Sequence, residues 1–187
     1  MTEEGTGRSH PEGDHMNQAL LNILEIALTM EEKGYSFYNK VVNTTKNPLG
    51  RAMFGRLRDD ELVHMERIKT IIAGIQGGSQ WRINYDLLPS RGQSTSEMFR
   101  ELARAHAQEL TPEADDVEAI NVGLDFEAKA VKFYEEHLKD ASDPLEQEFI
   151  RKMIVEEKDH HATCLELKRF YADPAAFFVE LEHPHMD

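Results

Sequence analysis

The chain has 187 residues and a net charge of −14, with 40% hydrophobic and 30% charged residues, a balance typical of a soluble globular domain. The acidic excess argues against partners that attract basic patches, namely nucleic acids and anionic membrane surfaces. The sequence also contains no apolar stretch of the roughly 20 residues that a membrane-spanning helix needs.

The opening segment, MTEEGTGRSHPEGDH, contains no apolar core. We therefore expect a disordered tail over 1–16 and no secretory signal. The single cysteine, Cys164, can form neither an internal disulfide nor a four-cysteine iron site, and we expect it to be a small buried hydrophobe. Both features favour a cytoplasmic location.

Four long segments have the apolar periodicity of amphipathic helices: 17–43, 48–73, 113–139 and 144–171. Two of the expected starts share one pattern, a capping side chain followed by proline, in Asn47–Pro48 and Asp143–Pro144. Glu146 completes a box-like start in the second case.

The connection 74–112 contains a loop with Trp81 and Tyr85, which we expect to pack onto the helices, and a shorter helix at 96–109. No strand-like alternation of any length is present. The expected fold is therefore all-α: a four-helix bundle of two helical hairpins over 17–171, joined by a long crossover with a short extra helix.

A C-terminal tail, 172–187, follows the bundle. Its Phe177 and Phe178 are suited to packing across the bundle or against a second chain, and the sequence leaves both options open. The crossover is long enough to pass one hairpin to a neighbouring chain, so a homodimer is one expected assembly.

The two hairpins are copies of one pattern, displaced by 96 residues. The matched pairs are Glu31 and Glu127, Phe37 and Phe133, Pro48 and Pro144, Glu61 and Glu157, and His64 and His160. A constant offset over separated blocks is typical of an internal duplication. Within the stretch EEKDHH at 156–161, the register selects Glu157 and His160 as the repeated pair, because Glu156 matches Asp60.

The spacing Glu-x-x-His places two side chains on one helix face. Glu31 and Glu61 each lie 15 residues from position 46, and Glu127 and Glu157 each lie 15 residues from position 142. In antiparallel hairpins these residues share one level. Six side chains are thus expected to converge: Glu31, Glu61, His64, Glu127, Glu157 and His160.

Four buried carboxylates repel one another unless cations are present, and two divalent ions would balance their charge. Oxygen-rich ligation with one imidazole per metal favours iron or manganese over structural zinc. The alternative is a solvated acidic face with unrelated histidines, which the repeat argues against.

This set of residues resembles the ferritin-like di-iron carboxylate proteins, and within them the rubrerythrin-like branch, over about 17–171. The resemblance implies two iron ions, with manganese or mixed-metal loading as the alternative. It also implies that Glu61 and Glu157 bridge the ions, with these terminal pairs: Glu31 with His64, and Glu127 with His160.

The chain departs from the rubrerythrin pattern at two points. Ala130 stands where the family has a further glutamate, and one cysteine is too few for a rubredoxin domain. The first departure removes a residue that, by the resemblance, takes part in the family's peroxide-reducing change of ligands. The second implies that electrons come from an external electron-donor protein.

Several residues near the expected ligands have two interpretations. Tyr38 and Tyr134 each follow a terminal glutamate by seven residues, on the same helix face. Each is either a core aromatic or a hydrogen-bond donor to a ligand carboxylate. Glu32 and Glu156 flank ligands and are expected to face solvent or to contact the ligands from outside.

Three functions remain open. The first is a non-haem di-iron oxidoreductase that reacts with peroxide or O2. The second is an iron-handling module for ferroxidase activity, iron storage or iron delivery. The third is a partner-binding helical bundle whose metal site is vestigial, and the intact set of six ligand types argues against it.

Overall fold

The structure, a computed structural model, describes residues 11–77, 94–106 and 114–182. These residues form six helices and no strand, so the predicted all-α class is confirmed. In chain order the helices are α1 (Pro11–Thr44), α2 (Pro48–Gln76), α3 (Thr95–His106), α4 (Ala114–Asp140), α5 (Pro144–Ala172) and α6 (Pro174–Glu182). The predictions for Trp81 and Tyr85 lie outside the described residues.

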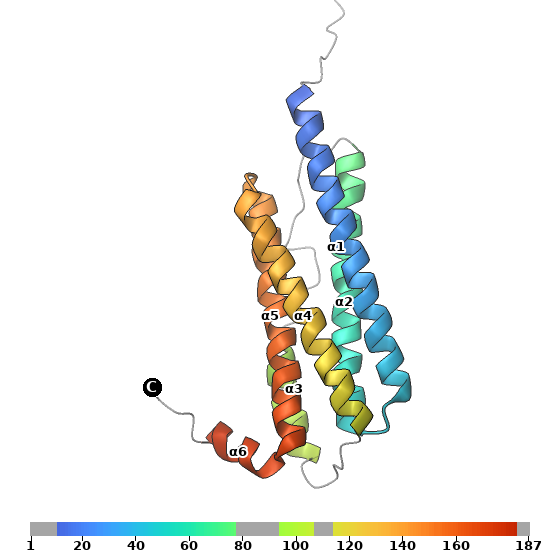
Figure 1. The fold of residues 1–187 in the computed structure, drawn as a ribbon. Helices are drawn as coiled ribbons and strands as arrows, with labels where there is room; N and C mark the ends of the chain where they lie inside the picture. Colours follow the sequence, from blue (N-terminus) through green and yellow to red (C-terminus); the bar gives the residue numbers. More distant parts are fainter. Residues whose placement is uncertain (1–10, 78–93, 107–113, 183–187) are drawn as a thin grey trace, which may run out of the picture.

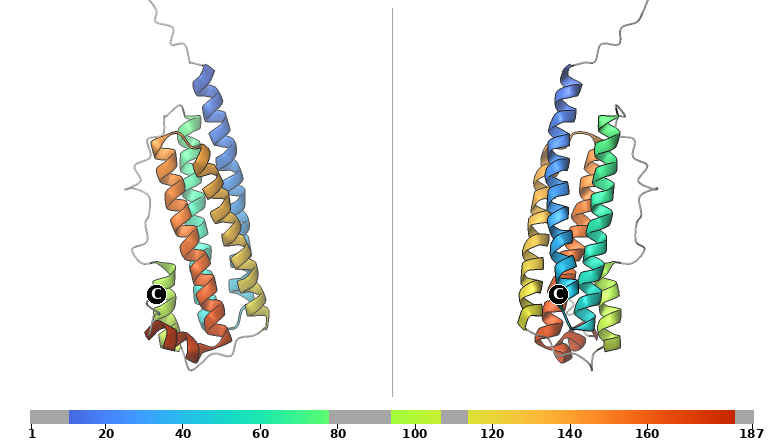
Figure 2. Two further views of the ribbon diagram at one scale, coloured as in Figure 1. Left: turned by 60° about the vertical axis from the view of Figure 1, so that its left-hand side comes forward. Right: turned by 90° about the vertical axis from the view of Figure 1, so that its right-hand side faces the viewer.

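The four long helices form a bundle of two antiparallel hairpins (Figure 1). Helix α1 packs along α2 and α4 packs along α5, and the hairpins meet through α1 with α4 and α2 with α5. The further views in Figure 2 show α1 and α5 running in one direction and α2 and α4 in the other. The two helices that carry Glu-x-x-His, α2 and α5, are therefore neighbours.

Side-chain caps fix where α2 and α5 begin. The Asn47 side chain accepts a hydrogen bond from the backbone of Gly50 (3.1 Å). The Asp143 carboxylate accepts from the backbone of Leu145 (2.8 Å) and Glu146 (3.1 Å), and the Glu146 carboxylate accepts from the Asp143 backbone in return. Both predicted starts are confirmed, because each cap satisfies N–H groups that a helix cannot pair internally.

The core consists of two apolar clusters at different heights of the bundle. One contains Met53, Phe54, Phe99 and Phe170 near the turn between α1 and α2. The other contains Ile68 and Ile71, with further apolar residues of α1 and α5, near the opposite end. The predicted ligands belong to neither cluster, so they form a polar layer between two apolar ones.

Helix α1 begins at Pro11, so residues 11–16 are helical rather than part of the disordered tail that the sequence predicted. Apolar periodicity starts only at Leu20, because the first turns of α1 project beyond the neighbouring helices (Figure 1). Proline fits the first turn of a helix, where its missing N–H is not needed, and no further proline interrupts 12–16.

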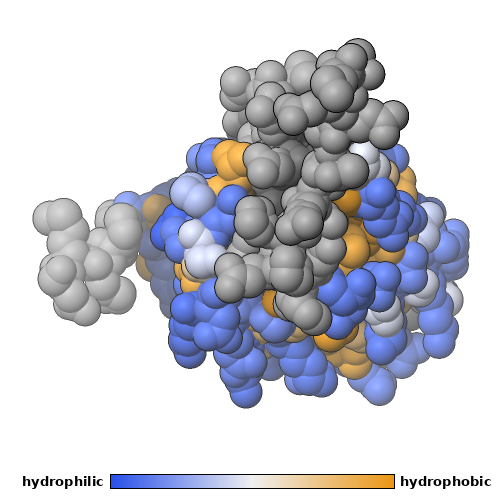
Figure 3. Space-filling view, turned by 90° about the horizontal axis from the view of Figure 1, so that it is seen from above, coloured by the Kyte–Doolittle hydropathy of each residue, from blue (hydrophilic) through white to orange (hydrophobic). Residues whose placement is uncertain are grey.

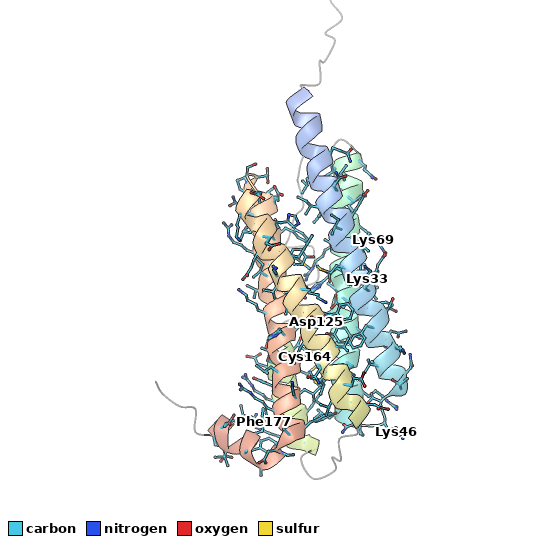
Figure 4. All side chains as sticks on the ribbon, viewed as in Figure 1. Lys33, Lys46, Lys69, Asp125, Cys164 and Phe177 are labelled. Atoms are coloured by element: carbon cyan, nitrogen blue, oxygen red, sulfur yellow. The ribbon has the colours of Figure 1, made fainter. Side chains whose placement is uncertain are left out.

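The C-terminal segment 172–187, predicted only as a tail, contains helix α6. Asp173 caps it by accepting a hydrogen bond from the backbone of Ala176 (2.9 Å), and Pro174 is its first residue. Phe177 of α6 (Figure 4) is buried against Phe99 and Phe170, so it packs across this bundle. The Asp-Pro pair is the same start signal that precedes α5.

Helix α3 lies against α5 and α2 at one end of the bundle. A reciprocal capping box begins it: the Glu97 backbone donates to the Ser94 hydroxyl (3.1 Å), and the Ser94 backbone donates to the Glu97 carboxylate (3.3 Å). This box explains why the helix starts at Thr95, one residue before the predicted start.

Hydrophilic residues cover most of the visible surface when the bundle is viewed end-on, outside the atoms drawn in grey (Figure 3). Among the described residues, none of the helices is both long and apolar enough to span a membrane.

Candidate metal centre

All six predicted ligands lie inside the bundle, at one level. Each is at most 3% exposed, although four are acids. Helices α1 and α4 contribute one glutamate each, and α2 and α5 contribute a Glu-x-x-His pair each; the side chains are Glu31, Glu127, Glu61 with His64, and Glu157 with His160. The duplication therefore supplies one half of the cluster from each hairpin.

Three side chains form the first group: His64, Glu31 and Glu157. The Nδ1 atom of His64 lies 3.2 Å from a carboxylate oxygen of Glu31 and 3.0 Å from one of Glu157. These three residues each offer one ligand atom, and the atoms all lie within 4.8 Å of one another. This separation suits a single cation.

Four side chains form the second group: Glu61, Glu127, Glu157 and His160, again with one ligand atom each within 4.8 Å of the others. The Nδ1 atom of His160 lies 3.6 Å from oxygens of both Glu127 and Glu157. Glu157 belongs to both groups, as expected of a bridging carboxylate, whereas Glu61, which was also expected to bridge, belongs to the second group only. The two imidazole rings stack, with centroids 5.4 Å apart.

Several buried ligand atoms make no hydrogen bond of good geometry among the described residues: both carboxylate oxygens of Glu157, Oε2 of Glu61 and Nδ1 of His160. Oε1 of Glu157 nevertheless lies 3.0 Å from His64 Nδ1. Unpaired buried polar atoms are costly, and native proteins rarely tolerate several in one place. A metal ion coordinated by these atoms would remove that cost. The donor set fits divalent cations that prefer oxygen and imidazole ligands.

The two tyrosines donate hydrogen bonds to the terminal glutamates across the hairpins. The Tyr134 hydroxyl, on α4, donates to Glu31 on α1 (2.6 Å), and the Tyr38 hydroxyl, on α1, donates to Glu127 on α4. Burial raises the pKa of both phenols well above the ordinary value, so both hydroxyls keep their protons. Of the two interpretations of these tyrosines, the structure therefore supports the hydrogen bond, and both rings are also buried in the core clusters.

The outer edge of each histidine contacts an acid from the opposite hairpin. His64 Nε2 lies 2.9 Å from Glu156, which also accepts a hydrogen bond from Arg67. His160 Nε2 lies 3.6 Å from Asp60. Such outer contacts orient the ring so that the other nitrogen faces the metal.

Asp60 and Glu156 occupy matched positions of the repeat, each directly before a Glu-x-x-His glutamate. The sequence left open whether Glu156 faces solvent or contacts a ligand, and the structure selects the contact. It left Asp60 without a role. Both residues could have been recognised from the sequence, because each forms an acidic pair with the glutamate of a Glu-x-x-His motif, at 60–61 and 156–157.

The surroundings raise the pKa of two of the ligand carboxylates and lower the pKa of a third. Burial raises the pKa of Glu127 to about 7, although His160 opposes the rise. Burial also raises the pKa of Glu61 well above its usual range, and the nearby Glu31 carboxylate adds to the rise. Burial acts in the same direction on Glu157, but His64 and His160 outweigh it and hold that pKa well below its usual range.

The pKa values of both histidines are raised, and here burial opposes the rise instead of causing it. Burial alone would lower the pKa of His64, but the carboxylates of Glu157 and Glu156 outweigh it and raise that pKa well above the ordinary value. The pKa of His160 is raised in the same way, by Asp60 and Glu127. Protons thus stabilise the cluster when no cation is bound, and cations would displace them.

A pocket of about 300 Å³ lies beside the centre, between α2, α5 and the start of α3. It borders both histidines, together with Arg56, Arg67, Asp60, Glu156, Asp159, Ser94, Thr95 and two valines. Glu156 is partly exposed, with 28% of its side chain accessible. The pocket lies on the side of the bundle where the outer edges of the two histidine rings are nearest to solvent.

Neighbouring residues considered from sequence lie around the centre without joining it. Glu32 is exposed. Cys164, on α5 (Figure 4), is 1% exposed, and burial raises the pKa of its thiol, so it is the buried small residue that was predicted. His137 packs edge-to-face against Phe133, with ring centroids 4.4 Å apart.

Two antiparallel hairpins that bury four glutamates and two histidines at mid-height define a ferritin-like helical bundle with a carboxylate and histidine cluster that could bind metal ions. The model of the Rubrerythrin family matches residues 22–168, and the chain belongs to that family. This membership suggests a di-iron carboxylate protein. Comparisons with curated proteins and with solved structures each found no significant match.

Proposed function

We propose that the chain is a di-iron carboxylate oxidoreductase that reduces peroxide or O2 with electrons from a separate donor protein. The observation that supports this most is the set of fully buried donor atoms on Glu61, Glu157 and His160 that make no hydrogen bond of good geometry among the described residues. Two iron ions in this centre would supply one electron each, which matches the two-electron reduction of a peroxide.

The proposed ligands have distinct tasks. Glu157 is shared by both positions, and the terminal ligands are Glu31 with His64 on one side and Glu127 with His160 on the other. The phenols of Tyr38 and Tyr134 hold the terminal carboxylates in place through their hydrogen bonds. The two apolar clusters enclose the ligand layer on either side along the bundle axis.

The proposal of an external donor follows from the composition. The sequence has one cysteine, which is too few for a four-cysteine iron site beside the di-iron centre. Catalytic turnover is therefore expected to require an added, reduced electron-donor protein.

The second candidate is an iron-handling module, and Ala130 favours it. In the family, a further glutamate takes part in the change of metal ligands that is linked to peroxide reduction. This chain has alanine at that position, so that ligand is missing. The centre would then oxidise Fe²⁺ for storage or delivery.

Stopped-flow absorbance distinguishes the two candidates. Metal-free protein is loaded anaerobically with two Fe²⁺ per chain and mixed with stoichiometric peroxide or with air-saturated buffer. Faster formation of the diferric protein with peroxide supports the oxidoreductase. Equal or faster oxidation by O2 supports the iron-handling module, particularly if a separate aerobic incubation with excess Fe²⁺ leaves tens of irons bound per chain. The control, Glu157→Ala, removes the shared carboxylate and is expected to bind no iron pair.

A further inference from the structure

The two halves of the centre contain the same residue types but offer different numbers of donors. The half around His160 has four residues within ligand distance of one another, and the half around His64 has three. The difference is Glu61, whose ligand atom lies within 4.8 Å of every other member only in the half around His160, although its carboxylate also lies beside Glu31 and His64. Its Oε2 atom lies 3.8 Å from His64 Nδ1, whereas Oε1 of Glu157 lies 3.0 Å from that nitrogen.

The position of the Glu61 carboxylate depends on a glycine in the facing helix. A β-carbon placed on Gly34 of α1 would lie 3.1 Å from both Cδ and Oε1 of Glu61 and 3.4 Å from Oε2. The two 3.1 Å approaches are closer than ordinary van der Waals contacts, so an alanine there would require the carboxylate to shift by a few tenths of an ångström. Glu61 therefore lies in space that any other residue at position 34 would partly fill.

The duplication supplies an internal comparison. Position 34 corresponds to position 130, where Ala130 is buried and carries the β-carbon that Gly34 lacks. The two halves thus differ at this position beside the centre, as they also do at Asp60 and Glu156. Glycine is also the poorest helix former apart from proline, and Gly34 is buried inside a 34-residue helix, so a close approach accounts for its presence.

We propose that Gly34 is a positioning residue: by leaving room for the Glu61 carboxylate beside α1, it makes the two halves unequal cation positions that fill in order, the four-donor half first. This inference deepens the proposed function and rests on it only in requiring that the centre binds metal. It does not depend on which oxidant or reductant is used.

The test is an anaerobic titration of the metal-free full-length protein with Co²⁺, followed by calorimetry and by the visible absorbance of bound cobalt. The native chain is expected to bind two ions in two resolved steps. Gly34→Ala is expected to weaken the first step about tenfold, the size of effect seen when the supports of metal ligands are altered. Circular dichroism of the metal-free variants checks that the fold is retained.

Two matched variants separate positioning from helix propensity. Gly74→Ala makes the same change within α2, where a new β-carbon would meet nothing within 4 Å, and it is expected to leave both steps unchanged. In a Glu61→Gln background, Gly34→Ala is expected to have no further effect on cobalt affinity, because it acts through Glu61.

The outcomes that overturn the inference differ from those that overturn the proposed function. A single step with two equal sites in the native chain contradicts unequal positions. Unchanged titration of Gly34→Ala, or an equal loss in the Glu61→Gln background, contradicts the positioning role. Failure of the native chain to bind either Co²⁺ or Fe²⁺ contradicts the proposed function itself.

Discussion

Four of the six candidate ligands contact a supporting side chain from the other hairpin: Glu31, Glu127, His64 and His160. Tyr134 and Tyr38 hold Glu31 and Glu127, while Glu156 contacts the outer edge of His64. Single hydrogen bonds of this kind contribute modestly to folding, but they decide the orientation of groups that must face a metal. The geometry of the centre is therefore a property of the packed hairpin pair and not of either hairpin alone.

Glu156→Gln tests this dependence. The substitution removes the charge that faces His64 Nε2 and Arg67, so the imidazole is less firmly oriented and less basic. We expect the affinity for Fe²⁺ or Co²⁺ to fall about tenfold, measured by anaerobic titration. Glu32→Gln is the matched control, because Glu32 also flanks a ligand glutamate but is exposed. Equal effects of the two substitutions would contradict a specific role for Glu156.

Three of the described helix starts follow one recurring signal, an Asx residue followed by proline. It occurs at Asn47–Pro48, Asp143–Pro144 and Asp173–Pro174, and a helix begins at each proline. The first two lie within the repeat and set the register that aligns the glutamates. The third begins α6, which folds back over the aromatic cluster of Phe99 and Phe170.

Docking of α6 is expected to contribute to stability through Phe177, which is 4% exposed. Phe177→Ala should lower the free energy of unfolding by about 3 kcal/mol, because a large buried side chain is removed and a cavity is left. Urea denaturation of the metal-free protein measures the change. Val179→Ala on the same helix is the control, and since Val179 is 60% exposed its effect should be close to zero. A loss below about 1 kcal/mol for Phe177→Ala would show that α6 is not firmly docked.

The bundle as a whole places a charged layer between two apolar clusters, and without metal that layer depends on protons. The raised pKa values of Glu61, Glu127, His64 and His160 mean that folding favours their protonated forms. The stability that these groups contribute is complete below their unfolded pKa values and is lost as the pH rises through the folded ones. The lowered pKa values of Glu156, at about 2, and of Glu157 act in the opposite sense, since their contribution is lost as the pH falls.

The melting temperature of the metal-free protein should therefore decrease as the pH rises from about 5 to 8. One pKa unit corresponds to about 1.4 kcal/mol, or about 3–6 °C for a protein of this size, so a decrease of several degrees is expected. Metal loading replaces the protons, and the loaded protein should melt at a higher temperature with the largest difference at the alkaline end. Calorimetric scans at matched pH measure both effects.

Glu61→Gln and Glu157→Gln serve as opposed controls for that experiment. The first imitates the protonated acid and should reduce the loss of stability at high pH. The second removes the carboxylate that both histidines face, and should lower the melting temperature of the metal-free protein near neutral pH. Identical melting of metal-free and metal-loaded protein would show that the layer is not buried as described.

The amino-acid sequence alone was sufficient to predict the all-α fold, the two hairpins and the convergence of Glu31, Glu61, His64, Glu127, Glu157 and His160. Helix periodicity, capping pairs and the constant offset are local or internal signals, and side chains equidistant from a turn must meet when the hairpin closes. The start of α1 at Pro11 and helix α6 were missed, because apolar periodicity was used to bound the helices.

The roles of Asp60, Glu156 and Gly34 depend on contacts between segments far apart in the chain. Only the tertiary structure brings Glu156 of α5 against His64 of α2, and Glu61 of α2 against Gly34 of α1. A repeat in the sequence predicts that two hairpins are alike, but it does not predict the side-chain contacts that form between them. Those contacts arise from close packing, in which each side chain occupies the space its neighbours leave.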